Sequence, residues 1–299
     1  MIVTLLLAVF STSILAEGLP DQFFKKGPIH SKLIRKVDQC VPTKSDKTIY
    51  FVKQWHAAPL VDTTKVESAR KLPQVKNQTE IFSAISQMIA EKVIDTAIAE
   101  GCEGEINSKF KAAYNGWTFE SLSQEVSSKK FNTILTNVLL KAEVKYPEKL
   151  KTYCGDDLIQ IKNAELALSD LRGDMGYWKR LVENEKKPAQ LKIYLDGVNE
   201  AFKLPSNTDS ATAIIALKKD VVESFKKFND ANHERNTALV NAIKKADSHK
   251  PILVVYGGLH IEDLKTKFEA EKWNCEVFEP KSYKNNEEKL IDDFKKITQ

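Results

Sequence analysis

The chain has 299 residues, of which 42% are hydrophobic and 29% are charged, so its composition excludes a wholly disordered or low-complexity protein. The 45 Lys and Arg residues outnumber the 41 Asp and Glu residues by only four, and so dilute a positive charge argues against nucleic-acid binding, which needs clustered basic residues. The length suits one large domain that can bury a full hydrophobic core.

Residues 1–16 have the features of a cleaved signal peptide. They contain no charged side chain, residues 5–10 form an apolar run, and small residues precede Ala16 and Glu17. No lysine or arginine precedes the apolar run, which departs from the usual pattern, and a buried N-terminal helix is the alternative. No later segment approaches the ~18 apolar residues of a membrane span, so we expect a periplasmic or secreted protein without stable membrane insertion.

If the protein is exported, its four cysteines can form disulfides, because an oxidising compartment permits such bonds. Cys40, Cys102, Cys154 and Cys275 allow three pairings, and none lies in a C-x-x-C motif of zinc or redox sites. Their spacing does not decide among the pairings. We expect two structural disulfides, with Cys102–Cys154 and Cys40–Cys275 as the working pairing.

The first part of the mature chain predicts an arm, then a strand. Residues 17–46 are polar and contain Pro20, Pro28 and Pro42, so we expect an N-terminal arm without regular structure. Residues 48–52 (TIYFV) are β-branched and aromatic and predict a buried strand.

Helix and strand patterns alternate after this strand. Apolar residues recur at helical spacing over residues 77–92, and residues 96–99 predict a second strand. From about 120 to 228 the chain is rich in Lys, Glu and Leu, with apolar positions three and four apart, and is interrupted clearly only at 153–155 and 204–207. No period of about 20–50 residues repeats, so we expect a helical insertion rather than a repeat array.

The last third returns to α/β alternation. A helix is predicted over residues 230–245, and residues 252–256 (ILVVY) give the strongest strand pattern of the chain. A helix over 261–271 and a strand at 275–278 follow, an order that implies a parallel pair of strands joined by a right-handed crossover. The expected fold is therefore α/β, with a mixed, mainly parallel central sheet flanked by helices. The expected divisions are the signal peptide (1–16), the arm (17–46), one domain (47–285) with its helical insertion (about 120–228), and a helical tail (286–299).

Residues able to do chemistry follow three of the predicted strands. His56 follows the first, Glu100 the second, and His260 the strand at 252–256, after Gly257 and Gly258. Ligands of open α/β sheets bind beyond the carboxyl ends of the strands. A single histidine there is more often structural, but two histidines and a carboxylate at one edge can supply three metal ligands.

The C-terminal part also resembles a known family. The run Glu234-Arg235-Asn236, followed by a strong strand, Gly257-x-x-His260 and an amphipathic helix, is similar to the TraB/Tiki group. That group shares a superfamily with the haem-uptake protein ChaN and the erythromycin esterases. Its pattern contains a first GxxH, a glutamate after the second strand, an arginine before the last core strand, and a second GxxH.

The resemblance assigns a role to individual residues. His260 with Gly257 would fill the second GxxH, Arg235 the arginine, and Glu100 the glutamate. His56 would fill the first histidine, but Lys53 stands where that motif has glycine, and this lysine would crowd the site or add positive charge. Glu103 is a rival for the glutamate, because Glu-Gly occurs at both positions.

The resemblance implies a metal-dependent hydrolase, most simply a peptidase, acting on a peptide or small-molecule substrate. His56, Glu100 and His260 would hold Mn²⁺, Co²⁺ or Zn²⁺, and Arg235 would stabilise an oxyanion or hold a substrate carboxylate. Glu100 could instead act as a general base. Two alternatives stay open, a metal-free esterase-like hydrolase and a non-enzymatic protein that binds haem, metal or a small ligand.

Overall fold

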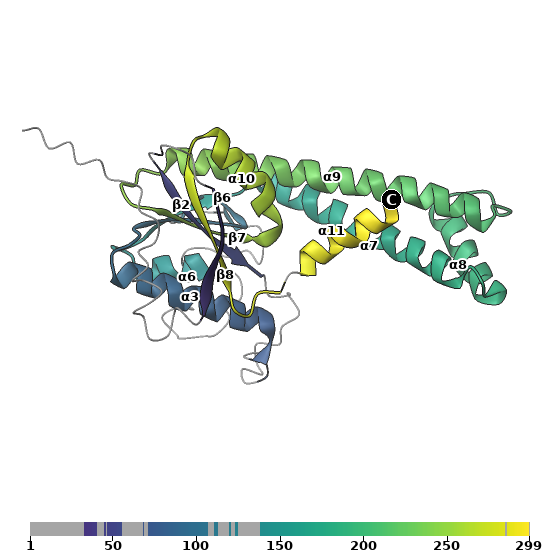
Figure 1. Ribbon diagram of the computed structural model, residues 1–299, viewed down its shortest axis with the longest axis horizontal. Coiled ribbons are helices and arrows are strands. Elements are labelled where there is room, and N and C mark those ends of the chain that lie inside the picture. Colours follow the sequence, from purple (N-terminus) through teal and green to yellow (C-terminus); the bar gives the residue numbers. More distant parts are fainter. Residues whose placement is uncertain are drawn as a thin grey trace, which may run out of the picture.

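The computed structural model describes residues 33–40, 45, 47–55, 68, 71–106, 111–112, 120, 123–124, 138–284 and 286–298. It has an α/β fold in which helices cover both faces of one sheet, as the sequence predicts (Figure 1). The helices are α3 (Pro73–Ala90), α6 (Val138–Lys145), α7 (Leu158–Asn184), α8 (Pro188–Ala201), α9 (Ser210–Lys245), α10 (Ile261–Ala270) and α11 (Asn286–Thr298), with a 3₁₀ turn η2 (Gly258–His260).

Within the described residues, the sheet has eight strands in the order β1-β8-β2-β7-β3-β6-β4-β5. The five central strands, β8, β2, β7, β3 and β6, are parallel to one another, while β1, β4 and β5 pair antiparallel at the two sides. The strands are β1 (Ile34–Cys40), β2 (Thr48–Gln54), β3 (Thr96–Ala99), β4 (Cys102–Glu105), β5 (Lys111–Ala112), β6 (Lys151–Gly155), β7 (Ile252–Gly257) and β8 (Asn274–Pro280).

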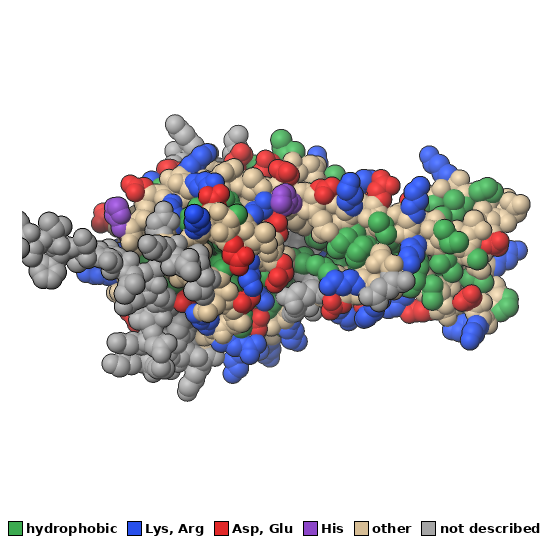
Figure 2. Space-filling model, turned by 45° about the horizontal axis from the view of Figure 1, so that its top comes forward, with side chains coloured by type: hydrophobic (Ala, Val, Ile, Leu, Met, Phe, Trp, Pro, Cys, Tyr) green, Lys and Arg blue, Asp and Glu red, His purple; other side chains and the backbone are tan. Residues whose placement is uncertain are grey.

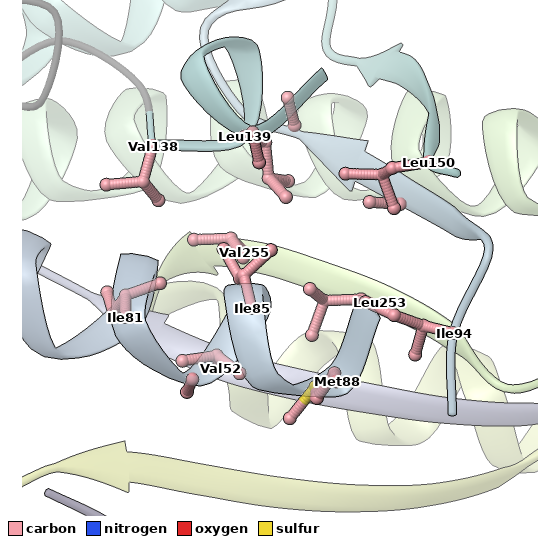
Figure 3. Packing of buried hydrophobic residues seen from close by; sticks show 14 of the residues in the cluster. Val52, Ile81, Ile85, Met88, Ile94, Val138, Leu139, Leu150, Leu253 and Val255 are labelled. Atoms are coloured by element: carbon pink, nitrogen blue, oxygen red, sulfur yellow. The ribbon is translucent and has the colours of Figure 1, made fainter. Parts of the chain in front are cut away.

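The central strands are apolar on both faces because each face is covered. In β7, Leu253 and Val255 face the core under α3 and α6, and Val254 and Tyr256 face the core under α9 and α10. Figure 3 shows the first of these cores, where Val255 packs with residues of α3 and α6. This two-sided burial explains the continuous apolar run that made β7 the strongest strand pattern.

Helices α7 and α9 form a long arm that extends well beyond the sheet, with α8 at its far end (Figure 1). The 36 residues of α9 make a rod of about 54 Å. Some apolar side chains of the arm are exposed, including Ile193 (70%) and Ile215 (71%), and Figure 2 displays green patches along it. The C-terminal helix α11 packs on the arm, with Phe294 stacked on Phe225 at 3.6 Å.

The expected irregular arm over residues 17–46 is wrong for its last part, because residues 34–40 form β1 at the side of the sheet. Only Ile34 and Cys40 of β1 are buried, and the residues between them are exposed. Charged residues are common in exposed edge strands and hide the alternation that predicts a strand. Residues 17–32 lie outside the described part of the chain.

The expected insertion is not wholly helical either, since it contains β6, which pairs with β3 and β4 inside the sheet. The uninterrupted run of helices therefore starts at α7. Among the described residues before α7, helix α6 packs on one face of the sheet. The two helices predicted on either side of residue 229 are one continuous helix, α9. The predicted C-terminal helix is confirmed as α11.

Both expected disulfides are present, Cys40–Cys275 between β1 and β8 and Cys102–Cys154 between β4 and β6. Such bonds are typical of proteins of oxidising compartments, in agreement with export. Within the described residues, no helix combines the length and apolar composition needed to cross a membrane.

Candidate functional site

Three neighbouring parallel strands end at one edge of the sheet, and acidic residues follow two of them. Glu100 follows β3, Asp156 follows β6, and Gly257 ends β7. Because these strands are parallel and adjacent, their carboxyl ends meet there, which is where α/β proteins bind ligands. Glu100 and Asp156 are buried, with side chains 7% and 0% exposed.

Arg235, from α9, lies between the two carboxylates. Its Nε and Nη2 atoms donate to the two oxygens of Asp156 at 3.0 and 2.9 Å, and Nη2 also donates to Glu100 Oε1 at 2.7 Å. Nη1 donates to Asn232 Oδ1, one turn earlier in α9, at 3.2 Å. Four hydrogen bonds thus hold a guanidinium that has five N–H donors. Burial opposes its charge, but Tyr256, Asp156 and Glu100 together raise the pKa of Arg235 well above its ordinary value.

The second carboxylate oxygen of Glu100 is held by the backbone. Oε2 accepts the N–H of Gly257 at 2.6 Å, so β7 fixes the side chain of the residue that follows β3. Glu103, the rival candidate, is exposed in β4. Of the two glutamates, Glu100 is the one that contacts Arg235.

His260 lies at the end of η2 and is 5% exposed. Its Nε2 atom is 3.7 Å from Glu100 Oε1, and its Nδ1 atom is 2.7 Å from Asn236 Oδ1. The ring packs edge-on against Tyr256, with centroids 4.8 Å apart. The hydrogen bond with Asn236 and the packing against Tyr256 therefore hold the imidazole in position and orientation.

Tyr256 packs against His260 and lies beside Arg235. Its hydroxyl donates to the Gly155 carbonyl oxygen at 3.2 Å. Burial, reinforced by the charges of Asp156 and Glu100, raises the pKa of Tyr256 well above its ordinary value. The phenol therefore keeps its proton and acts as a fixed donor beside Arg235 and His260.

Gly258 and Lys53 meet at the rim of the same edge. A Cβ atom on Gly258 would overlap the hydroxyl of Tyr283, which lies after β8, so a larger residue at 258 would have to displace that ring. Lys53, where the resembled family has glycine, is only 12% exposed, with Nζ 3.4 Å from Glu279 Oε2 and 5.5 Å from the centre of the Tyr283 ring. The Lys53 ammonium is paired with Glu279 and lies near the Tyr283 ring. Lys53 and Tyr283 therefore lie together at the rim of this edge.

The first predicted histidine, His56, lies outside the described residues. The residue before it is described, and the backbone of Trp55 is held on both sides by α3. Asn77 accepts its N–H at 2.9 Å, and Gln78 donates to its carbonyl at 2.8 Å. Both amide side chains are fully buried, so the carboxyl end of β2 is firmly anchored.

Three of the four predicted catalytic residues, Glu100, Arg235 and His260, therefore lie together. Sequence reasoning missed Asp156, because β6 was taken as an interruption between helices. The signal was present in Asp156-Asp157, where Asp157 caps α7 by accepting the N–H groups of Ile159 and Gln160.

Within the described residues, no group of three or more His, Cys, Asp or Glu side chains is arranged to hold a metal ion. The predicted set of His56, Glu100 and His260 includes a residue outside that part of the chain. Comparison with known protein families, curated proteins and solved structures finds no significant match to this chain.

Proposed function

We propose that the protein is an exported metal-dependent hydrolase of the TraB/Tiki type, acting as a peptidase. The observation that carries this proposal is the 3.7 Å separation between His260 Nε2 and Glu100 Oε1, at the ligand-binding edge of a parallel sheet. The two disulfides support export, and the GxxH and Glu-Arg-Asn motifs support the family.

The donor set fits a divalent cation. Two ligands bonded to one zinc-like ion at about 2.0–2.2 Å stand about 3.3–3.6 Å apart at the tetrahedral angle, close to the separation of His260 and Glu100. The local charge also fits, because one guanidinium, Arg235, faces two buried carboxylates, Glu100 and Asp156. His56, which follows the end of β2 by two residues in the sequence, would be the third ligand. An imidazole and carboxylate set suits Mn²⁺, Co²⁺ or Zn²⁺.

The bound ion, Glu100 and Arg235 would have different roles in hydrolysis. A bound ion would lower the pKa of a coordinated water towards about 7 and polarise the scissile carbonyl. Glu100 supplies a carboxylate whose orientation is set by Arg235 and by the Gly257 N–H. Arg235 is committed to Glu100 and Asp156, so we expect it to position Glu100 rather than to bind the substrate.

A metal-free esterase-like hydrolase is the second candidate. The same 3.7 Å separation would let His260 Nε2 and Glu100 contact one water molecule, with His260 as the general base. Asn236, on the far side of the ring, would orient that base. The metal ion is thus the difference between the two candidates.

Metal analysis of the purified full chain tests the proposal. The wild type should hold one divalent ion per chain, and His260→Ala and His56→Ala should lose it. The exposed His249 is the matched control, so His249→Ala should keep the ion. Circular dichroism should show that all variants keep their helices.

Hydrolysis assays separate the candidates. A peptide and ester panel, with and without a chelator, should give turnover that the chelator abolishes and the metal restores. Turnover unaffected by the chelator, in a wild type without metal, would favour the metal-free hydrolase. No turnover, with a haem absorbance band that His260→Ala removes, would replace both by a binding protein.

A further inference from the structure

A chain of hydrogen bonds runs from His260 to the surface. His260 Nδ1 lies 2.7 Å from Asn236 Oδ1, and Asn236 Nδ2 lies 2.7 Å from Asp263 Oδ2. The other oxygen of Asp263 lies 3.0 Å from His233 Nδ1, and His233 Nε2 lies 3.2 Å from Lys267 Nζ. Helices α9 and α10 supply all the links except His260, which directly precedes α10.

The hydrogen bonds from His260 through Asn236 to Asp263, the inner half of this series, can be donated in only one direction. An ionised carboxylate only accepts hydrogen bonds, so the contact with Asp263 must come from the NH₂ group of Asn236. The amide oxygen of Asn236 then faces His260, and an amide oxygen also only accepts. The proton between them must therefore belong to His260 Nδ1.

The outer half agrees with this direction. The ammonium of Lys267 only donates, so His233 Nε2 accepts from it and His233 Nδ1 donates to Asp263. Asp263 accordingly accepts from both sides. Lys267 Nζ also lies 4.0 Å from Asp263 Oδ2, so an opposite charge faces this partly buried carboxylate.

We propose that Asn236 and Asp263 are positioning residues that hold His260 as the tautomer with its proton on Nδ1. A neutral imidazole protonated on Nδ1 has its lone pair on Nε2, the atom that faces Glu100. This is the tautomer that a metal ligand or a general base at Nε2 requires. The need for it rests on the proposed function, whereas the tautomer itself follows from the hydrogen bonds alone.

Nitrogen NMR of the metal-free full chain tests the tautomer directly. Protein labelled with ¹⁵N-histidine would be studied at about pH 8, above the ordinary histidine pKa of about 6.5. The His260 signals, assigned by their loss in His260→Gln, should report a protonated Nδ1 and an unprotonated Nε2. Signals of the opposite tautomer, or averaged signals of both, would overturn the proposal.

Variants of Asn236 extend the test. Asn236→Leu removes the acceptor at similar side-chain size, so the His260 signals should move to a mixture of tautomers. Asn241, exposed on the same helix, is the matched control, and Asn241→Leu should leave the signals unchanged. Unchanged His260 signals in folded Asn236→Leu would contradict the proposed role of Asn236.

The variant Asp263→Asn tests whether the direction of the Asn236 hydrogen bond, and not contact alone, sets the His260 tautomer. An asparagine at 263 can donate as well as accept, so the Asn236 amide is free to turn over and the tautomer should again become mixed. If the site binds metal, both positioning variants should weaken binding by about 10–100-fold. A fixed tautomer in a wild type that neither binds metal nor hydrolyses anything would refute the proposed function and leave this inference standing.

Discussion

Cys102 and Cys154 join β4 to β6 two residues from each of the buried carboxylates that hold Arg235. Glu100 precedes Cys102, and Asp156 follows Cys154. The backbone reinforces this join, since Gly101 N–H donates to Asp156 Oδ2 at 3.1 Å. The disulfide therefore fixes the two anionic partners of Arg235 relative to each other.

Removing this disulfide should damage the site more than removing the other one. In the chain-entropy view, Cys102–Cys154 spans 52 residues and contributes about 4 kcal/mol, whereas Cys40–Cys275 spans 235 residues and contributes about 5 kcal/mol. Cys102→Ser with Cys154→Ser should nevertheless lose more metal or catalytic activity than Cys40→Ser with Cys275→Ser. Both would be assayed at a temperature where each is folded. Equal losses would mean that the disulfide near the site contributes stability alone.

Truncating Asp156 should strongly destabilise the fold. Asp156→Ala leaves the buried Arg235 with only Glu100 as an anionic partner, and breaking a buried ion pair costs about 3–5 kcal/mol. Urea unfolding measures the change. The neighbouring Asp157→Asn is the control, because asparagine caps a helix about as well as aspartate and should cost less than about 0.5 kcal/mol. Similar losses in the two variants would argue against the ion pair as the cause.

Glu143 should make stability fall as the pH rises. Burial raises the pKa of Glu143 from 4.5 to about 7, so the folded state holds its proton more tightly than the unfolded state. Stability is then lost between about pH 4.5 and pH 7, by an amount on the order of 1 kcal/mol after allowance for solvent screening.

Glu143→Gln removes this titration and should flatten that part of the pH profile. Urea unfolding at several pH values gives the profile. The exposed Glu148 is the control, and Glu148→Gln should follow the wild type. A wild-type slope that survives in Glu143→Gln would assign the effect to other groups.

Gly258→Ala should be costly because of Tyr283. The added methyl would overlap the Tyr283 hydroxyl, and such overpacking costs about 1–3 kcal/mol. Gly257→Ala is the matched change, because a Cβ there would meet only ordinary contacts, 3.4 Å or more from His260 and Glu100.

A double-mutant cycle tests the cause. In a Tyr283→Ala background, Gly258→Ala should cost nearly nothing, as measured by thermal or urea unfolding. An unchanged cost in that background would place the strain elsewhere.

The sequence predicted the elements whose burial leaves a clear pattern. The strands β2 and β7 appear as apolar runs, and α10 appears as an amphipathic helix between strands. The positions of Glu100 and His260 followed, because Glu100 comes directly after one predicted strand and His260 lies in the turn after another.

The missed elements lack such a pattern for physical reasons. In β6 a lysine and a tyrosine alternate with smaller residues, and Gly155 packs so closely on Ile98 and Leu239 that a Cβ would overlap them. Its place in the sheet comes from pairing with β3 and β4, which are distant in sequence. Asp156 was missed with the strand that carries it.

The chain of hydrogen bonds from His260 to the surface could not be predicted either. Asn236 and Asp263 are each one of several polar residues on two amphipathic helices, and nothing in the spacing says that their side chains meet. That contact depends on how α9 and α10 pack against the same face of the sheet.

The unbroken course of α9 has a mechanical consequence. Arg235 and Asn236 belong to the same rod as Ile215, 20 residues or about 30 Å further out on the arm. No hinge in the backbone separates them, since one ladder of helical hydrogen bonds connects the two ends. A twist or tilt applied to the outer arm by any load is thus delivered to the side chains that hold Glu100 and His260. A proline in the exposed middle of α9 would act as a joint and disconnect the two ends.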